Sequence, residues 1–380
     1  MRLNCLFCSL GIREEKLNML LNYKRWSRLH LDLPLLCALG LLVLIGLTVL
    51  YSAGSGSWDL MQRQAIRLGL AFIVLVVFAQ IPPTYYRTWA PWLFLAGMIL
   101  LIAVALFGEV RKGGQRWLSL GFMTIQPSEI MKLAVPMMLA WYLSTKKLPP
   151  SLRDIAIALA LLLIPTLLIA EQPDLGTAIL IAASGLFVLF LSGISYRVII
   201  AVVIMVGAAM PLLWHALHDY QRNRIITLFN PEHDPLGTGY HIIQSKIAVG
   251  SAGWYGKGWM NGTQSQLQFL PERTTDFIFA VFSEEFGFIG VLILLLLYFV
   301  IIGRGLYLAS QAQETFTRLL AGGIILTFSF YVIVNGAMVI GLLPVVGIPM
   351  PLLSYGGTSL ITLSAAFGML MSIHTHRKIL

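Results

Sequence analysis

The chain has 380 residues, of which 58% are hydrophobic and 11% are charged, and its mean hydropathy is +0.81. A soluble domain carries about 25% charged residues, so the composition excludes an ordinary soluble protein. The net charge is +9, but the sequence has no Lys- and Arg-rich run interleaved with aromatic residues. The charge therefore does not indicate nucleic-acid binding.

Apolar runs of the length that crosses a bilayer follow one another along the chain. A membrane-spanning helix needs about 20 mostly apolar residues, and the sequence lacks the short alternating segments of a β-barrel. The runs lie at Pro34–Leu50, Leu68–Ile81, Trp89–Phe107, Glu129–Leu143, Ile155–Ala170, Ala178–Ile194, Val198–Leu217, Phe277–Ile302, Leu319–Leu342 and Thr358–Ile373. We therefore expect an all-α, polytopic transmembrane bundle of about ten spans. One membrane-embedded domain over residues 31–380 would follow a tail of residues 1–30.

Basic residues in the short loops predict the orientation of the bundle, because Lys and Arg gather on the cytoplasmic side. If residues 1–30 are cytoplasmic, that side receives most of the basic residues of the short loops. The opposite side receives few, apart from Arg63, Arg67 and the cluster Arg111–Arg116. An even number of spans returns the C-terminus to the cytoplasm, so both termini are predicted to lie there.

The first polar cluster on the extracytoplasmic side is GEVRKGGQRWLSLGFMTIQPSEIMK, in which Arg116 and Trp117 precede the start of a helix. Pro127 suits the first helical position, and Glu129 lies in the first turn. Lys132 follows three residues later, so the two side chains share a helix face and can pair. The pair is either structural, or Glu129 holds Lys132 in place for an anionic substrate.

The longest polar segment, residues 218–275, lies on the same side, between the seventh and eighth spans. Most connections have about 4–6 residues, so a loop of this length indicates a function. Its stretch HIIQSKIAVGSAG is typical of an amphipathic helix at the membrane surface. The shorter stretches EQPDLGT and PVVGIPMPLLSYGGTS share this side, so we expect the active face there. The cations of the long loop, which are residue types that hold phosphates, are Arg222, Arg224, Lys246, Lys257 and Arg273.

Three acids stand at the start of the eighth span. Asp276 has two compatible interpretations. It is a helix N-cap or an acid at the positive end of the helix dipole, and it is also suited to be a partly desolvated carboxylate with a raised pKa that acts as a general base. Glu284 and Glu285 follow at a depth where acids need partners or a wet cavity. They are either a proton relay of the kind that transporters use, or partners for polar groups elsewhere in the chain. No His or Cys spacing indicates a metal site.

Six stretches resemble the motifs of the SEDS (shape, elongation, division and sporulation) family: KGGQRWLSLG, QPSEIMK, QPDLGT, DPLGTGYHIIQSKIAVGSAG, GTQSQLQFLPERTTDFIFAVFSEEFGFIG and PMPLLSYGGTS. The resemblance runs from about residue 30 to the C-terminus, and it is closer to the rod-shape branch than to the division branch. It implies a peptidoglycan glycosyltransferase of the bacterial inner membrane that polymerises lipid II on the outer side during cell elongation. The implied partners are a class B penicillin-binding protein, which is a transpeptidase, and other membrane proteins of the elongation complex.

By the same resemblance, Asp276 is the essential catalytic carboxylate, and Trp117, Glu129 and Lys132 match other functionally important positions. We expect a single inverting displacement, in which Asp276 takes the proton from the 4-hydroxyl group of the acceptor sugar. Candidates to hold the diphosphate are Lys132, Arg116, Lys246, Arg222 and Arg273. No cofactor is required, although a divalent cation would assist at the diphosphate. The alternatives are a flippase that moves lipid II across the bilayer and a non-catalytic scaffold for the transpeptidase.

Overall fold

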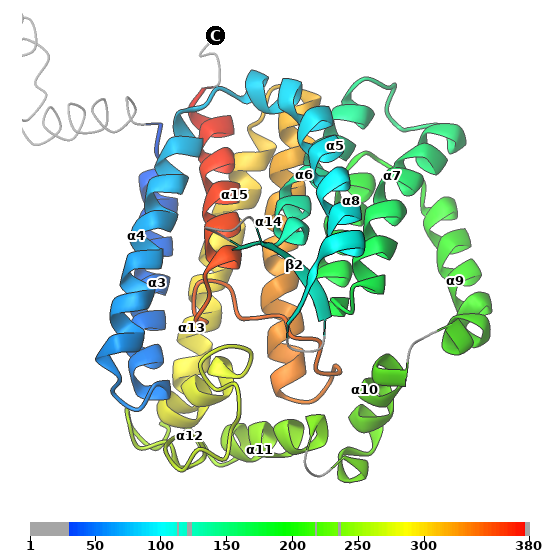
Figure 1. Ribbon diagram of the computed structural model, residues 1–380. Helices are drawn as coiled ribbons and strands as arrows, with labels where there is room; N and C mark the ends of the chain where they lie inside the picture. Colours follow the sequence, from blue (N-terminus) through cyan, green and yellow to red (C-terminus); the bar gives the residue numbers. More distant parts are fainter. Residues whose placement is uncertain (1–29, 112–113, 120–123, 217–218, 235–236, 377–380) are drawn as a thin grey trace, which may run out of the picture.

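A computed structural model describes residues 30–111, 114–119, 124–216, 219–234 and 237–376. Among them, seven helices are long and apolar enough to cross a membrane: α3 (Leu33–Ala53), α4 (Trp58–Gln80), α5 (Pro83–Phe107), α7 (Leu152–Glu171), α13 (Ile278–Ser310), α14 (Thr315–Val339) and α15 (Thr358–Thr375). Three further helices stand beside them (Figure 1): α6 (Pro127–Ser144), α8 (Leu175–Leu191) and α9 (Tyr196–Ala216). Each helix overlaps one predicted run, so the all-α polytopic fold is confirmed.

Helix α4 departs most from its predicted run. It was expected to start at Leu68, but it starts at Trp58, with Ser57 as its N-cap. Arg63 and Arg67 therefore lie within a helix, and their predicted place in a short loop is wrong. A helix can continue through polar residues where it reaches the water–lipid boundary. The apolar run therefore underestimated the length of α4.

The first and last spans meet at one end of the bundle (Figure 1). The Asp32 carboxylate caps α3 by accepting from the Leu35 amide at 3.0 Å, and it pairs with Arg304 at 2.6 Å. The His30 ring stacks on the His376 ring, with centroids 3.7 Å apart. The start of α3 and the end of α15 thus share one side, as an even number of spans requires.

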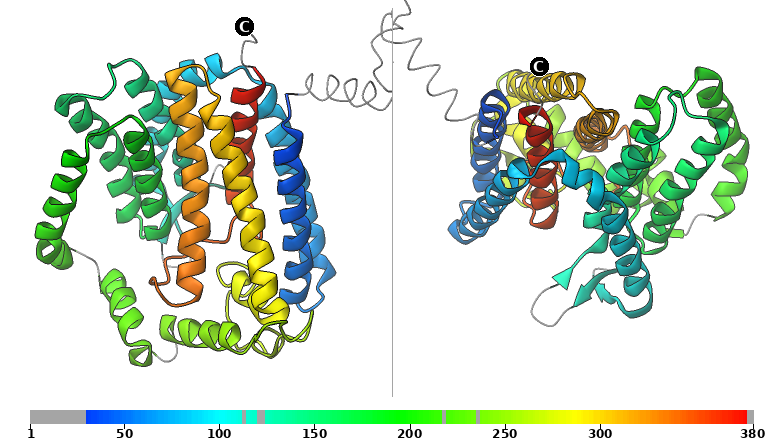
Figure 2. Two further views of the ribbon diagram at one scale, coloured as in Figure 1. Left: turned by 180° about the vertical axis from the view of Figure 1, so that it is seen from behind. Right: turned by 90° about the horizontal axis from the view of Figure 1, so that it is seen from above.

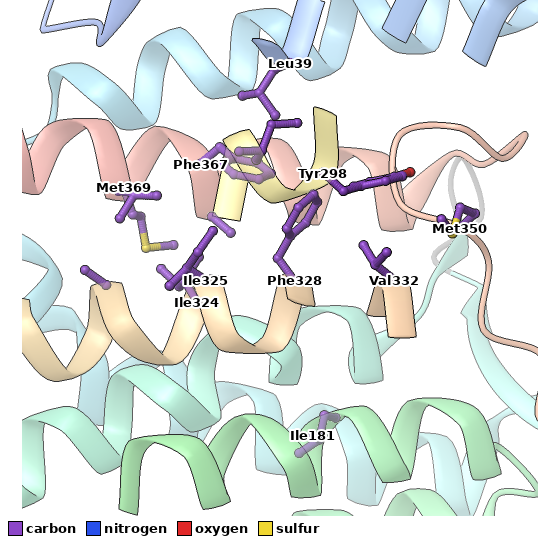
Figure 3. Packing of buried hydrophobic residues seen from close by; sticks show 14 of the residues in the cluster. Leu39, Ile181, Tyr298, Ile324, Ile325, Phe328, Val332, Met350, Phe367 and Met369 are labelled. Carbon is purple, nitrogen blue, oxygen red and sulfur yellow. The ribbon is translucent and has the colours of Figure 1, made fainter. Parts of the chain in front are cut away.

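The centre of the bundle is apolar and packed by aromatic rings (Figure 3). Phe328 and Phe367 are almost fully buried and meet edge to face with centroids 5.0 Å apart. The Tyr298 hydroxyl donates to the Pro351 backbone oxygen at 2.7 Å, which ties α13 to the segment that precedes α15. On the outer faces large apolar side chains such as Ile73 and Phe299 are exposed, which is typical of a lipid-facing surface.

The opposite end of the bundle carries the polar elements (Figures 1 and 2). Three short strands form an antiparallel sheet in the order β1 (Glu109–Arg111), β2 (Gly114–Ser119) and β3 (Thr124–Ile125). The long loop folds into α10 (Asp219–Phe229), the 3₁₀ helix η1 (Pro231–His233), α11 (Thr238–Gly250) and α12 (Thr263–Gln266). Helix α11 confirms the amphipathic helix predicted in HIIQSKIAVGSAG, whereas the sheet was not predicted.

Helix α13 has a break near its first turns, at the end from which the long loop enters it, and the long loop fills the break. Gly287 has a φ of +67°, which residues with a side chain rarely adopt, so the regular ladder of helix hydrogen bonds stops there. The freed carbonyl groups accept from the loop instead: Lys257 N donates to Glu284 O at 2.9 Å, and Gly258 N donates to Glu285 O at 3.0 Å. The break therefore fixes the long loop against the first turns of α13.

A cavity of about 680 Å³ lies between α11, α13 and α14. Its lining is mainly apolar and includes Phe279, Val291 and Val332. Asp276 is not among the lining residues, although Phe279 belongs to the turn that follows it. The cavity and the predicted catalytic group are therefore neighbouring but separate features.

Candidate functional site

Asp276 lies just before the start of α13 but does not cap it. The helix begins at Ile278, and its N-cap is Phe277. The expected N-cap role of Asp276 is therefore wrong, because the chain turns into the helix one residue later. The carboxylate lies just outside the positive end of the helix dipole.

The backbone of Asp276 is held by one amide side chain from α14. Asn335 is fully buried, and its Nδ2 donates to Asp276 O at 2.9 Å and to Ile348 O at 2.7 Å. Gly347 has a φ of +76°, and a Cβ placed on it would lie 3.6 Å from the Asp276 Oδ2. Asn335 thus joins the catalytic segment to residues 347–348, which pass directly beside the carboxylate.

The residues just before Asp276 are joined to the SYGGTS motif. Ser354 Oγ donates to Thr275 O at 2.7 Å, and the Tyr355 amide donates to Thr274 O at 2.8 Å. Together with Asn335, these bonds hold both sides of Asp276 to the segment between α14 and α15. Motifs that lie about eighty residues apart in the sequence therefore build one site.

Arg224 of α10 links this carboxylate to charged groups of two further elements. It lies close enough to Asp276 and Asp174 for the charges to interact. Burial lowers the pKa of the Arg224 guanidinium, Arg116 also lowers it, and both carboxylates raise it. Arg116, Asp174, Arg224 and Asp276 are called the mouth cluster below. In it the predicted catalytic acid interacts with a partly desolvated cation.

Within the mouth cluster, Arg116 is engaged by the EQPDLGT motif. Its Nε donates to Gln172 O at 3.3 Å, its Nη2 donates to Pro173 O, and its Nη1 lies 3.9 Å from Asp174 Oδ1. The other oxygen of Asp174 accepts from Gln126 Nε2 at 3.0 Å. Arg116 therefore anchors the start of α8 as well as adding positive charge to the mouth.

Glu129 and Lys132 form the predicted ion pair on α6. Lys132 Nζ lies 2.7 Å from Glu129 Oε1, with both side chains about nine-tenths buried. Thr362 Oγ1 donates to the other Glu129 oxygen at 3.0 Å, and Lys132 Nζ lies 5.8 Å from the centroid of Tyr331. The pair faces α14 and α15, and Gln126, just before α6, links this helix to the mouth cluster. Its predicted contact with substrate stays a prediction.

Trp117 and the remaining candidate cations lie around this centre without converging on it. Trp117 is half-buried on β2. Arg222 donates to the backbone oxygens of Trp214 and His215 at the end of α9, at 2.9 and 2.6 Å. Arg273 donates to Ser265 O and, at 3.1 Å, to Ser55 Oγ. Lys246 is exposed on α11, close to Gly341 at the end of α14. The structure thus places Arg222 and Arg273 in backbone-holding roles.

Comparison with known proteins identifies the family that this arrangement represents. The family model described as "Cell cycle protein", which covers FtsW, RodA and SpoVE, matches residues 28–379. The chain belongs to this family. Peptidoglycan glycosyltransferase MrdB of Escherichia coli K12 is 56% identical over 356 residues, which are 93% of this chain and 96% of that protein. A probable peptidoglycan glycosyltransferase FtsW of Escherichia coli O6:H1 is 36% identical, over 82% of this chain and 76% of that one.

Solved structures of the FtsW/RodA/SpoVE family have the same fold. One, described under "Structural coordination of polymerization and crosslinking by a peptidoglycan synthase complex", matches with a TM-score of 0.79 and 32% identity, over 90% of this chain and 97% of that one. The rod shape determining protein RodA of Thermus thermophilus matches with a TM-score of 0.69 and 28% identity, over 91% and 98%. These matches confirm the resemblance to the rod-shape branch, a multi-pass membrane protein and the glycosyltransferase activity that the motifs predicted.

In this member of the FtsW/RodA/SpoVE family, Glu284 and Glu285 are partners for polar groups of the chain itself. Glu284 Oε1 accepts from Lys257 Nζ at 2.8 Å, from Thr263 Oγ1 at 2.9 Å and from the Gln264 amide at 3.1 Å. Glu285 accepts from Ser52 of α3. These bonds support the second of the two readings of the acids, because each side chain bonds the long loop or a neighbouring span.

The sequence did not single out three polar residues, Arg224, Asn335 and Arg67, that the structure places near Asp276 or the segment that follows α14. Arg224 was one of five cations in the long loop, and nothing in the pattern separated it from Arg222. Asn335 is one polar residue in an apolar run. The sequence pattern of such a residue is the same whether it makes a structural hydrogen bond in the core or has a functional role. Arg67 stood immediately before the predicted run Leu68–Ile81, and a charge inside a span is the signal that could have identified it.

Proposed function

We propose that this chain polymerises lipid II into glycan strands during cell elongation, on the outer side of the bacterial inner membrane, with Asp276 as general base. One observation carries the proposal. The Asp276 carboxylate lies outside its helix, beside Gly347 and within charge interaction of Arg224, where three motif-bearing segments converge. A carboxylate beside a cation at the end of a span suits a substrate with a sugar and an anionic diphosphate on a lipid.

The proposed reaction is one inverting displacement. The 4-hydroxyl oxygen of the acceptor sugar bonds to C1 of the donor sugar, and its proton passes to the Asp276 carboxylate. The bond between C1 and the diphosphate oxygen breaks at the same time, and the diphosphate leaves with the electron pair. General-base catalysis of this kind is worth about 10²–10⁴-fold in rate.

Stabilising the leaving diphosphate requires positive charge near Asp276. Arg224 is the strongest candidate, because it is partly buried and interacts with the catalytic acid. Arg116 adds charge behind it, whereas Lys132 is already paired with Glu129 at 2.7 Å. Charge-assisted bonds to a departing oxyanion often contribute more than the base does. A divalent cation bound to the diphosphate would add to this stabilisation.

We further propose a class B penicillin-binding protein as the partner, within a larger elongation complex. A related chain matched here belongs to what its description calls a peptidoglycan synthase complex that polymerises and crosslinks. A polymerase whose product leaves on the outer face needs a transpeptidase on that face.

Purified protein supplied with lipid II in detergent tests the proposal, since detergent micelles have no second leaflet. We expect glycan polymer in detergent. Movement of lipid II across liposome membranes without polymer in either system would instead show a flippase. A third outcome is polymer that forms only after the transpeptidase is added, while the transpeptidase alone makes none. That result would show that the partner switches the enzyme on. No polymer under any of these conditions would support a scaffold and contradict the proposal.

A further inference from the structure

Arg67 is a cation within a membrane span. It lies nine residues after Trp58, the first residue of α4, which is about 14 Å along the helix axis. Its side chain is half-buried rather than directed wholly to the outside. A charge at such a depth is costly, and it usually faces the interior of the bundle where it serves a function.

The surroundings of Arg67 do not neutralise its charge. The guanidinium carbon lies 4.4 Å from the centroid of the Tyr355 ring, a cation–π contact. Among the residues that the structure describes, no carboxylate lies within ion-pair distance of Arg67, whereas Arg63 pairs with Asp59 and Arg304 pairs with Asp32. The charge at position 67 is therefore held in place by a ring and remains available to an anion.

A second polar side chain lies on the same helix face. Gln64 is buried, and its Oε1 accepts no hydrogen bond from any residue that the structure describes. It precedes Arg67 by three residues, so both side chains lie on one face of α4. This face of α4 is therefore more polar than the lipid-facing surface of a span.

Arg67 is linked to the segment of Asp276 through Tyr355. Tyr355, the ring under the guanidinium, donates its amide to Thr274 O at 2.8 Å, two residues before Asp276. Helix α4 stands at one edge of the bundle and α10 at the other (Figure 1), and the view from behind agrees (Figure 2). Arg67 and Arg224, which interacts with the charge of Asp276, are thus carried by different parts of the molecule.

We propose that Arg67 binds the diphosphate of a polyprenyl-linked sugar, at a second anion site separate from Arg224. The proposal rests on the function proposed above. Polymerisation brings together two polyprenyl diphosphates, the lipid II unit and the growing strand, and each carries its own anion. Separate cations on different elements would hold the two diphosphates apart while the sugars meet at the carboxylate.

Binding of polyprenyl diphosphate to the purified protein in detergent tests the site, in an Asp276→Asn background so that no turnover occurs. We expect two saturable sites. Arg67→Gln should weaken one of them about tenfold or more, since hydrogen bonds to charged groups contribute about 1.5–3 kcal/mol and 1.4 kcal/mol is tenfold. Arg67→Lys should be intermediate, because it keeps the charge but loses the two-pronged geometry.

Arg87→Gln is the matched control, because it removes the same charge from an exposed position at the start of α5. It should leave both sites unchanged, and polyprenol of the same chain length should bind equally to every variant. The site assignment is wrong if Arg67→Gln binds polyprenyl diphosphate normally at both sites. It is also wrong if the affinity for polyprenol falls by the same factor as the affinity for polyprenyl diphosphate. If the melting temperature of Arg67→Gln is well below that of the parent, the Arg67→Lys variant is used instead. Normal affinity of Arg67→Lys at both sites would then overturn the proposal. Failure of the wild-type protein to polymerise lipid II would contradict the proposed function but would not alter this binding result.

Discussion

Two acidic regions at the start of α13 differ in what their carboxylates bond. Glu284 is fully buried, and one of its oxygens accepts three hydrogen bonds from the long loop. Asp276 lies before the helix, where Asn335 holds its backbone oxygen and its charge interacts with that of Arg224. The first acid joins the long loop to α13, and the second lies among charged groups that come from other segments of the chain.

This difference separates an acid that holds the fold together from the acid proposed as catalytic more clearly than depth or charge does. Both regions place acids near the end of a span, where ionisable groups suggest function. A carboxylate that bonds a loop of its own chain stabilises that loop, and replacing it should change stability. A carboxylate held through its backbone can take a proton without unfolding its surroundings, and replacing it should change turnover.

Apart from Asp276 itself, the largest effect is expected at Asn335. Asn335→Ala removes the amide that joins the carbonyl groups of Asp276 and Ile348, so the carboxylate loses its fixed position. A displacement of about 1 Å can cost about 10²-fold in rate, so we expect kcat for lipid II polymerisation to fall about 10–100-fold. The KM for lipid II should change little, because the amide does not face the substrate.

Asn230→Ala, at an exposed position after α10, is the control for Asn335→Ala and should leave both constants unchanged. A rise in KM that matches the loss of kcat/KM would show that Asn335 supports binding rather than the position of Asp276.

A smaller effect, on stability, is expected in the Glu284 region. Lys257→Met leaves the buried Glu284 carboxylate without its cation. Because the Lys257 side chain is 26% exposed, solvent screening reduces the cost, and we expect a loss of about 1–2 kcal/mol. The melting temperature should fall by a few degrees, while turnover per folded molecule stays within about threefold. The exposed Lys147→Met is the charge-matched control. Loss of turnover without loss of stability would return Glu284 to the catalytic machinery.

The smallest expected effect is a pH dependence of stability that comes from His241 on α11. Burial lowers the pKa of its imidazole from the ordinary 6.5, although Glu272 and Asp234 oppose the shift. The folded protein therefore favours the neutral ring, which stacks on Phe277 with centroids 5.7 Å apart. This stability is present above pH 6.5 and is lost as the pH falls through 6.5 toward the lowered pKa. In melting curves from pH 8 to pH 5, His241→Phe should decline less than the wild type, and an equal decline would contradict the assignment.

The sequence predicted the spans well because hydrophobic length is a local property. It failed at α4, where Arg63 and Arg67 were read as the edge of a run although the helix continues around them. It also could not choose between Arg222 and Arg224. The two lie two positions apart, so they cannot share one helix face, and only the docking of α10 decides which one faces the mouth.

The features of the site also divide into those that a local pattern predicts and those that only the packing of the helices determines. The Glu129–Lys132 pair could be predicted because helix geometry fixes its spacing. The contact between Asp276 and Gly347, and the bond from Asn335, depend on how three spans pack. No local pattern contains that information. The position of Asp276 at the start of a span and the motif resemblance indicated a candidate base, but neither could place it beside Gly347 and Asn335.

The central claim is that Asp276 takes the proton from the acceptor sugar. Asp276→Asn, which keeps the shape of the side chain but removes the base, tests it when lipid II binding and turnover are measured on the same purified sample. We predict that lipid II binds within about threefold of the wild type while polymerisation falls at least 100-fold, the lower bound for general-base catalysis. Near-normal polymer from a folded Asp276→Asn protein, or a loss of turnover fully explained by lost binding, would contradict the account.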